Sequence, residues 1–440
     1  MEVIAVAPWI YIEDLKKHIG EEVTLKGWLY NMRSSKKIRF LEVRDGTGIV
    51  QCVMGAGDVP AGVFESTGGI SRESSIIVTG IVKEDARSKI GVEIGLTGLE
   101  LVAKAQPYPI AKKSHGPAFL LDHRHLWIRS RKQVALLRIR HEVIRTLRGY
   151  FDKRGYVCFD PPIFTANACE GTSTLFQTDY FGKTAYLSQS GQLYGEAGAL
   201  ALGRIYTFGP TFRAEKSKTR RHLTEFWMME PEIAYLDIEG VMELVEDMLV
   251  ELVAVILDKR AEELKVLERD TSLLEKVRKP FPRVHYKDAA AKLTKMNDRF
   301  KVPFEDGDDF GAEHETELTK SYEKPIFVHR FPAEIKAFYM KRDKDDPQAS
   351  LSVDCLAPEG YGEIVGGGER EDDLDALLKR LGEHSLPKEA FDWYIDLRKY
   401  GSVPHSGFGL GLERTISWIA GIHHLREAIP FPRTIERLTP

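Results

Sequence analysis

Short runs of alternating apolar and polar residues dominate the first hundred positions of the chain. Runs with the composition of β-strands cover residues 22–30, 39–44, 48–54 and 75–83, and Asp45-Gly46-Thr47-Gly48 between two of them is a strong hairpin signal. Several short strands at this spacing predict a five-stranded barrel of the OB type. We therefore expect residues 1–103 to form a small all-β domain.

The pattern changes after residue 103. Prolines, lysines and glycine between residues 104 and 130 predict a linker, and apolar positions at helical spacing over residues 131–154 predict an amphipathic helix that opens a larger domain, residues 131–440. The short strand after this helix ends at Asp160-Pro161-Pro162, which indicates a sheet edge or an interface because proline is excluded from central strands. The remaining pattern predicts helices from residue 193 and at 237–267, 374–381 and 388–400, a helix and loop at 287–304, and strands at 326–330, 337–341, 350–356 and 363–366.

The composition is that of a globular protein with a large core. The 440 residues suffice for two or three domains, 43% are apolar and 29% charged, and with a formal charge of −4 any contact with nucleic acid depends on local basic patches. Cys52, Cys158, Cys169 and Cys355 form no CxxC pair and have no zinc spacing, which favours reduced thiols. The chain starts without a basic leader and has no membrane-spanning apolar run, so we expect a cytoplasmic protein.

A strongly basic loop lies between two strand-like runs within residues 205–232. The first run ends at Gly209-Pro210 and the second begins near Thr224, and the cations between them are Arg213, Lys216, Lys218, Arg220, Arg221 and His222. Arginine forks match phosphate oxygens and an aromatic ring can stack on a base, so the loop suits a polyphosphate attached to a nucleobase. The alternative is a solvated hairpin tip.

A glycine-rich run over residues 401–414 closes the domain. Gly407, Gly409 and Gly411 let a backbone approach a ligand closely, and Arg414 stands where a strand passes into a helix. The run matches neither a P-loop nor a dinucleotide fingerprint.

Positive charge also gathers in one part of the predicted barrel, where the cations Arg33, Lys36, Lys37, Arg39 and Arg44 lie near Phe40. Basic residues beside an exposed aromatic suit single-stranded nucleic acid. The alternative is that Phe40 belongs to the barrel core and that the lysines only make the domain soluble.

Three segments, in order, resemble the three motifs of the class II aminoacyl-tRNA synthetases. The helix and strand ending at Pro162 are similar to motif one, Phe212-Arg213-Ala214-Glu215 with His222 and Phe226 to motif two, and Gly409-Leu410-Gly411-Leu412-Glu413-Arg414 to motif three. An OB-fold before such a core resembles the aspartyl, asparaginyl and lysyl subgroup. The stretches LSQSGQLY, RAEKSKTRRHLTEFWMMEPE, APEGYGEIVGG and YGSVPHSGFGLGLER resemble its asparaginyl members, and the resemblance covers residues 22–440.

The resemblance implies an α+β fold, with an anticodon-binding OB-fold and a catalytic domain made of a mainly antiparallel sheet flanked by helices. It implies a homodimer formed through the helix and strand ending at Pro162, and ATP and Mg²⁺ as cofactors. The implied reaction activates L-asparagine as its adenylate and transfers it to the 3′ end of tRNA(Asn).

Residues that match the motifs take the family's roles by implication. Arg213 is expected on the α-phosphate and the amino acid carboxylate, and Arg414 on the γ-phosphate and, opposite Phe226, on the adenine ring; both are the expected catalytic residues. The expected ATP contacts are Arg213, Glu215, Arg221, His222, Leu223, Phe226, Glu363, Gly411 and Arg414, and the expected magnesium ligands are Asp354 and Glu363. The expected asparagine contacts are Glu170, Ser188, Gln189, Gln192, Arg213, Glu225 and Arg370. The expected anticodon contacts are Arg33, Phe40 and Gln51.

The alternatives to these roles are structural, with Asp354 and Glu363 as surface ion pairs and Phe226 as a core residue. The run before Arg370 also departs from the family, whose members commonly carry Ser-Gln where this chain has Gly368-Glu369.

The choice between asparagine and aspartate depends on the side-chain pocket. A matching aspartyl enzyme is expected to carry a lysine where this chain has Gly195 and an aspartate where it has Glu230. A carboxamide both accepts and donates, so Arg370 is expected to donate to its oxygen, and Glu225 or else Glu230 to accept from its nitrogen.

Three other functions are compatible with parts of the pattern. They are a non-discriminating aspartyl enzyme, a tRNA-independent enzyme that makes asparagine from aspartate and ammonia, and a nucleic-acid-binding protein with a degenerate core. The barrel speaks against the second. The residues that speak against the third are Arg213, Glu215, Asp354, Glu363 and Arg414.

Overall fold

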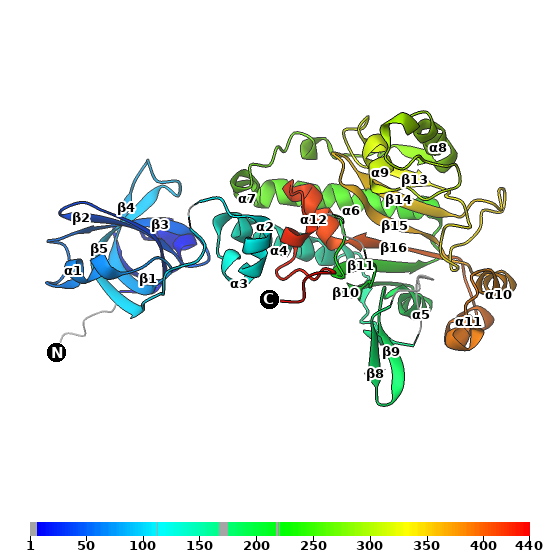
Figure 1. Cartoon of the computed structure of the whole chain (residues 1–440), viewed down its shortest axis with the longest axis horizontal. Helices are drawn as coiled ribbons and strands as arrows, with labels where there is room; N and C mark the ends of the chain where they lie inside the picture. The colour runs from blue at the N-terminus through cyan, green and yellow to red at the C-terminus, as the bar shows by residue number, and fades with distance from the viewer. Residues whose placement is uncertain (1–6, 112, 167–174, 217–218, 220) are drawn as a thin grey trace. The chain divides into compact units, whose positions relative to one another are not determined.

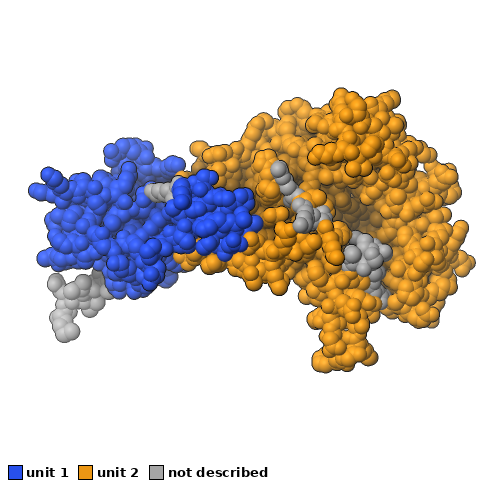
Figure 2. Space-filling view, in the orientation of Figure 1, with its two compact units in different colours: residues 1–123 blue, residues 124–440 orange. Residues whose placement is uncertain are grey.

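The computed structural model describes residues 7–111, 113–166, 175–216, 219 and 221–440. It divides into two compact units, residues 1–123 and 124–440, which are coloured separately in Figure 2. The segment 104–130, expected as a linker, contains α2 (Pro117–Asp122) and α3 (Arg124–Trp127). Within the described ranges, no helix combines the length and the apolar character needed to cross a membrane.

The first unit contains a closed five-stranded barrel, which confirms the predicted OB-fold. The strands are β1 (Glu22–Ser34), β2 (Ile38–Arg44), β3 (Ile49–Gly55), β4 (Ser75–Glu84) and β5 (Val92–Ala103), and they close in the order β1-β2-β3-β5-β4. Besides α2, the short elements of this unit are η1 (Ile12–His18), α1 (Val63–Ser66) and η2 (Thr67–Gly69). Alternate residues such as Leu41 and Val43 fill the barrel core.

The second unit is built on an eight-stranded sheet (Figure 1). In sheet order its strands are β12 (Arg283–His285), β13 (Ile326–His329), β14 (Ser352–Ala357), β15 (Gly362–Glu369), β16 (His405–Gly411), β11 (Glu225–Ala234), β10 (Arg204–Phe212) and β6 (Val157–Cys158). Only the two outer pairs are parallel, so the predicted mainly antiparallel sheet is confirmed. A three-stranded sheet holds β7 (Phe164–Thr165), β9 (Lys183–Leu187) and β8 (Gln177–Tyr180).

Alternation along the strands separates the faces of the large sheet. Met229, Phe408 and Leu410 pack into the main core with α4 (Arg131–Asp152), α6 (Ile238–Lys259) and α12 (Leu412–Ala420). Residues one position away point to the opposite face. There α5 (Gln192–Leu202) packs on β10 and β11.

The other elements of this unit lie around the sheet. They are α7 (Ala261–Val266), η3 (Leu274–Lys276), α8 (Tyr286–Thr294), η4 (Asn297–Arg299), α9 (Ala312–Thr319), α10 (Leu374–Glu383), η5 (Lys388–Phe391), α11 (Asp392–Lys399) and α13 (Leu425–Ala428).

One predicted element is wrong in kind, and another is interrupted. Residues 337–341 form turns instead of a strand, because the consecutive side chains Phe338, Tyr339 and Met340 are all buried against α10 and α11, which a strand with one open face does not allow. The helix predicted over 237–267 is two helices. The backbone of Arg260 leaves the helical region (φ −125°, ψ 23°), and its guanidinium donates to Glu142 Oε2 at 2.8 Å.

Candidate active site

The face of the sheet opposite the main core, which we call the open face, carries three glycines of β16. Along β16, Phe408 and Leu410 point into the core, so Gly407, Gly409 and Gly411 all lie on the opposite face. A Cβ at Gly409 would lie 2.3 Å from Met228 Cε, and one at Gly407 would lie 2.2 Å from Glu232 Cδ. Side chains of neighbouring strands therefore occupy the space that larger residues on β16 would fill.

A cavity on this face collects every residue predicted to bind ATP. Its lining includes Arg213, Glu215, Arg221, His222, Leu223, Phe226, Glu363, Gly411 and Arg414. The guanidinium carbon of Arg213 lies 5.4 Å from the centre of the Phe226 ring. Phe226 thus faces the cavity, although it also packs beside Leu223 and Leu425.

The cations of this cavity contact carboxylates from distant parts of the chain. Arg414 Nη1 donates to Glu363 Oε2 at 3.0 Å, and Arg221 Nη1 donates to Glu315 Oε2 at 2.9 Å. Burial raises the pKa of Glu315 to about 7, with the nearby Glu363 carboxylate acting in the same direction. Burial lowers the pKa of His222, and the charge of Arg414 lowers it further.

The two predicted magnesium ligands lie on neighbouring strands with Gly366 between them. Asp354 is directly opposite Gly366 in the sheet, and a Cβ on Gly366 would lie 3.4 Å from Asp354 Oδ1 and 2.7 Å from Glu363 Oε1. Their other oxygens bind cations, since Lys336 Nζ donates to Asp354 Oδ2 at 2.8 Å. Burial raises the pKa of Asp354 to about 7, whereas Arg414 lowers that of Glu363 against the effect of burial.

Three of the seven predicted asparagine contacts lie in the loop that enters α5 or at the first residue of that helix. Ser188, Gln189 and Gln192 are all buried, and Ser188 O accepts from the backbone N–H of Phe212, which places the loop beside Arg213. Glu230 on β11 accepts from the backbone N–H of Gly191 at 2.9 Å and from Thr207 Oγ1 at 3.1 Å, so it supports this loop. Glu170 lies outside the described residues.

Arg370 is buried at the end of β15 and forms a two-pronged ion pair. Its Nη2 and Nε donate to the two oxygens of Glu232 at 2.5 and 3.2 Å. Burial raises the pKa of Glu232 to about 7 against the opposing effect of Arg370. Nη1 of Arg370 faces Met340 Sδ at 3.7 Å, a weak acceptor that a ligand oxygen can replace.

Glu225 does not lie with the other predicted asparagine contacts. Phe226 and Met228 line the open face, and the strand alternation that puts them there turns Glu225 to the other side of β11. Its backbone pairs with Phe212 and with Arg433 of the C-terminal segment. The strand register thus turns Glu225 away from the face that carries Phe226 and Met228.

Glu413 ties the three motif-like segments together. This buried side chain at the start of α12 accepts from Arg140 Nη1 of α4 at 2.7 Å and from the backbone N–H of Trp227 on β11 at 3.0 Å. The contacts fix the first turn of α12, and with it Arg414, relative to the strand that carries Phe226.

The three predicted anticodon residues lie on the outside of the barrel. Phe40 alternates with the core residue Leu41, is partly exposed and stands opposite Arg33 on β1. The guanidinium carbon of Arg33 is 6.0 Å from the centre of the Phe40 ring, and Gln51 Nε2 donates to Glu93 at 3.2 Å. The structure therefore rejects the alternative that Phe40 is a core residue.

The sequence reasoning missed Lys336, Glu315, Glu232 and Glu196, which bind the predicted site residues. Lys336 and Glu315 lie outside all three motifs, and nothing in their local sequence indicates the contact. Glu196 had a signal, because it stands four residues after Gln192 on one helix, a spacing at which side chains meet.

Comparison with known proteins gives consistent matches over the whole chain. Residues 117–435 match the family model described as tRNA synthetases class II (D, K and N), and residues 23–104 match an OB-fold nucleic acid binding domain. An asparagine–tRNA ligase of Sorangium cellulosum is 54% identical and covers 98% of this chain and 99% of its own length. One from Thermus thermophilus is 50% identical, covering 98% and 100%.

A solved structure is similarly close. Asparaginyl-tRNA synthetase from Pyrococcus horikoshii, complexed with asparaginyl-adenylate, superimposes with a TM-score of 0.94 at 44% identity, covering 98% of this chain and 99% of that one.

Proposed function

The chain belongs to the class II tRNA synthetases of the D, K and N group, and from this premise we propose that it is an asparagine–tRNA ligase. It activates L-asparagine with ATP and transfers the asparaginyl group to tRNA(Asn). The observation that carries the proposal is the convergence of Arg213, Phe226 and Arg414 on one cavity beside the buried loop of Ser188 to Gln192.

In the first step, an oxygen of the asparagine α-carboxylate attacks the α-phosphorus of ATP, and pyrophosphate leaves. The protein supplies position and charge, because an in-line displacement at phosphorus needs no protein nucleophile. We assign the α-phosphate and the attacking carboxylate to Arg213, and the γ-phosphate to Arg414. Phe226 and Arg414 enclose the adenine ring, and Glu215 bonds its amino group.

In the second step, the 3′-hydroxyl of the terminal tRNA adenosine attacks the carbonyl carbon of the adenylate and AMP leaves. The barrel face of Phe40, Arg33 and Gln51 binds the anticodon. A partly exposed ring beside a guanidinium offers stacking and charge to an unpaired base.

The residues at Gly366 fit a hard divalent cation. Asp354 Oδ1 and Glu363 Oε1 both approach the same glycine, while their second oxygens bind Lys336 and Arg414. No cluster of three or more His, Cys, Asp or Glu side chains suitable for a metal occurs among the described residues. Two carboxylates suit Mg²⁺, which completes its shell with water and substrate phosphates. When bound, the ion neutralises phosphate charge.

The pocket chemistry favours asparagine over aspartate. The charge of Arg370 is already paired with Glu232, and Gly195 supplies no second cation, so neither position offers an unpaired positive charge to a side-chain carboxylate of the substrate. Arg370 Nη1 can donate to a carboxamide oxygen instead of to Met340. Rejection of a ligand that leaves such polar groups unpaired can reach about 10⁴-fold.

We further propose a homodimer formed through α4 and the strand that ends near Pro162. β6 is an outermost strand of the large sheet, and the side chains of Val157 in it and of Ile163 after it are exposed. An unpaired strand edge with exposed apolar side chains is a site for pairing with another chain. Sedimentation of the purified protein, compared with a Val157→Asp variant, tests this contact.

The activity is tested by ATP–pyrophosphate exchange with asparagine or aspartate as the sole amino acid, followed by charging of tRNA(Asn) and tRNA(Asp) transcripts. An Arg213→Ala preparation controls for host enzyme. We expect exchange with asparagine and charging of tRNA(Asn) alone. Equal or faster exchange with aspartate would identify a non-discriminating aspartyl enzyme, and ammonia-dependent amide synthesis without tRNA would identify the tRNA-independent relative.

A further inference from the structure

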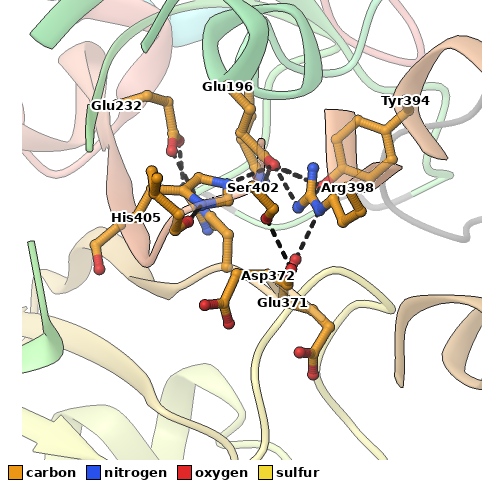
Figure 3. Close-up of polar contacts among 12 residues, drawn as sticks. Glu196, Glu232, Glu371, Asp372, Tyr394, Arg398, Ser402 and His405 are labelled. Atoms are coloured by element: carbon orange, nitrogen blue, oxygen red, sulfur yellow. Dashed lines mark hydrogen bonds and ion pairs between the residues drawn. The ribbon is translucent and has the colours of Figure 1, made fainter. Parts of the chain in front are cut away.

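Behind the proposed asparagine pocket lies a fully buried group of charged side chains, which we call the Glu196 cluster: Glu196, Tyr394, Arg398 and His405. Figure 3 shows the other three side chains converging on Glu196. Arg398 Nη2 and the Tyr394 hydroxyl each lie 2.7 Å from Glu196 Oε2, and His405 Nε2 lies 3.0 Å from the same oxygen. Glu196 belongs to α5, Tyr394 and Arg398 to α11, and His405 to β16.

The cluster holds Glu196 as a carboxylate. Burial by itself would raise the pKa of Glu196, but Arg398 and His405 outweigh it and the pKa is lowered. The two ring nitrogens of His405 lie 2.7 Å from Val403 O and 3.0 Å from Glu196 Oε2, so the ring is held between the carbonyl and the carboxylate. A carboxylate can only accept hydrogen bonds, and every neighbour of Glu196 must therefore donate.

This requirement fixes the orientation of Gln192, one turn earlier on α5. Gln192 Nε2 donates to Glu196 Oε1 at 3.0 Å, so the amide oxygen of Gln192 points the other way. Gln192 is buried, and among the described residues its amide oxygen has no hydrogen-bond partner. A ligand N–H is the group that this oxygen can accept.

The same cluster holds the backbone around Arg370. Arg398 Nε donates to Glu371 O at 2.7 Å, and the Arg370 N–H donates to His405 O at 2.9 Å. Ser402, which follows α11, donates from its hydroxyl to Asp372 O at 2.7 Å. Two of these three anchors of the Arg370 segment, Arg398 and His405, are themselves bound to Glu196.

We propose that Glu196 is a positioning residue for asparagine recognition, which sets Gln192 and the Arg370 segment together before the substrate arrives. This inference rests on the proposed function. Gln192 then offers a fixed hydrogen-bond acceptor and Arg370 a fixed donor. Binding of asparagine therefore does not lose the conformational entropy that ordering flexible side chains would cost.

Stability alone is a poor explanation of the cluster. Burying several charges costs desolvation that their mutual attraction barely repays, and well-packed apolar residues at such positions are often as stable or more stable. The cluster does supply directional hydrogen bonds, which apolar packing cannot.

The test is Glu196→Gln, which keeps the volume and removes the charge. The new amide can satisfy Gln192 and Arg398 together only in part, so Gln192 loses its fixed orientation. In asparagine-dependent exchange we expect the KM for asparagine to rise roughly 10- to 100-fold, the range for losing a hydrogen bond to a charged group. The KM for ATP should stay within about twofold, because the nucleotide cavity is not bound to the cluster.

Glu142→Gln is the matched control. Glu142 is also buried and paired with two arginines, Arg145 and Arg260, but it lies on α4 away from both asparagine contacts. We expect it to lower the melting temperature without changing the KM for asparagine. A role of Glu196 in stability alone predicts the same behaviour for both variants.

If Glu196→Gln does not fold, Tyr394→Phe tests the positioning role instead, because it removes only one hydroxyl from the cluster. We expect a several-fold rise in the KM for asparagine alone. An unchanged KM in a folded Glu196→Gln variant, or in Tyr394→Phe if only that one folds, overturns the inference. Absence of asparagine-dependent exchange in the unmodified protein overturns the proposed function instead.

Discussion

Replacing Glu413 with alanine should destabilise the catalytic unit severely, because this buried side chain joins three segments of the fold. The change removes the charge partner of the buried Arg140 and the acceptor for the backbone N–H of Trp227. Arg140 Nη1 keeps one contact, the carbonyl of Ala428 at 2.8 Å. A neutral oxygen does not compensate a buried guanidinium.

The magnitude follows from these losses. Breaking a buried ion pair from one side costs about 3–5 kcal/mol, because the remaining charge is left uncompensated. An unsatisfied backbone N–H adds about 1–3 kcal/mol, and since both groups relax around one site the two costs do not add fully. We expect a loss of about 4 kcal/mol for Glu413→Ala, and about half of that for Glu413→Gln, which keeps an acceptor for Trp227.

Urea unfolding, monitored by tryptophan fluorescence, measures this loss of stability. The urea concentration at the midpoint should fall, while the dependence of the free energy of unfolding on urea concentration stays constant. The variants Arg140→Met, Glu413→Ala and their combination form a double-mutant cycle, which measures the interaction between the two side chains. We expect the double variant to be more stable than the sum of the single changes predicts, by about 2 kcal/mol or more. A loss below about 1 kcal/mol for Glu413→Ala, or additivity within about 0.5 kcal/mol, would refute the reasoning.

Three further outcomes are expected. Arg213→Ala should lower the exchange rate about a hundredfold or more, as expected for one guanidinium removed from developing charge, and near-normal exchange would contradict its assignment. Phe40→Ala should weaken tRNA charging and leave exchange intact, whereas loss of both would mean that Phe40 supports folding. The pKa of His329 is lowered from 6.5 to about 4 by burial and by Arg330. Its contribution to stability is therefore present above pH 6.5 and lost as the pH falls towards 4, by up to about 3 kcal/mol. When the free energy of unfolding is measured at decreasing pH, it should fall less steeply for His329→Asn than for the unmodified protein. Identical pH curves for the two proteins would show that His329 does not cause the loss.

The elements that the sequence predicted well are those whose signal is local. Strand alternation and turn chemistry located the barrel, and the motif-like stretches around Arg213 and Arg414 lie on a strand pair and a strand–helix junction whose own backbone aims them at one cavity. The sequence did not predict which face of a strand each side chain lies on. Glu225 and Phe226 are neighbours in sequence, and only the register shows that they lie on opposite faces.

The sequence did not predict which carboxylates pair with the arginines of the site. Arg221 contacts Glu315 across 94 residues of sequence, and Arg398 contacts Glu196 across 202. A contact between distant segments leaves no periodic trace in either one. The basic loop could be read as a phosphate site, but the carboxylates that hold its arginines could not.

The fit of Glu232 between two glycines makes the pocket a candidate for chemical rescue. A Cβ at Gly407 would lie 2.2 Å from its carboxyl carbon, and one at Gly195 would lie 3.2 Å from its Cγ, so the backbone itself moulds the space. A Glu232→Ala enzyme would keep this mould, lined on one side by the guanidinium of Arg370 and shaped to a short carboxylic acid. Acetate or propionate supplied in the medium could then stand in for the missing side chain, which would make aminoacylation dependent on a diffusible acid.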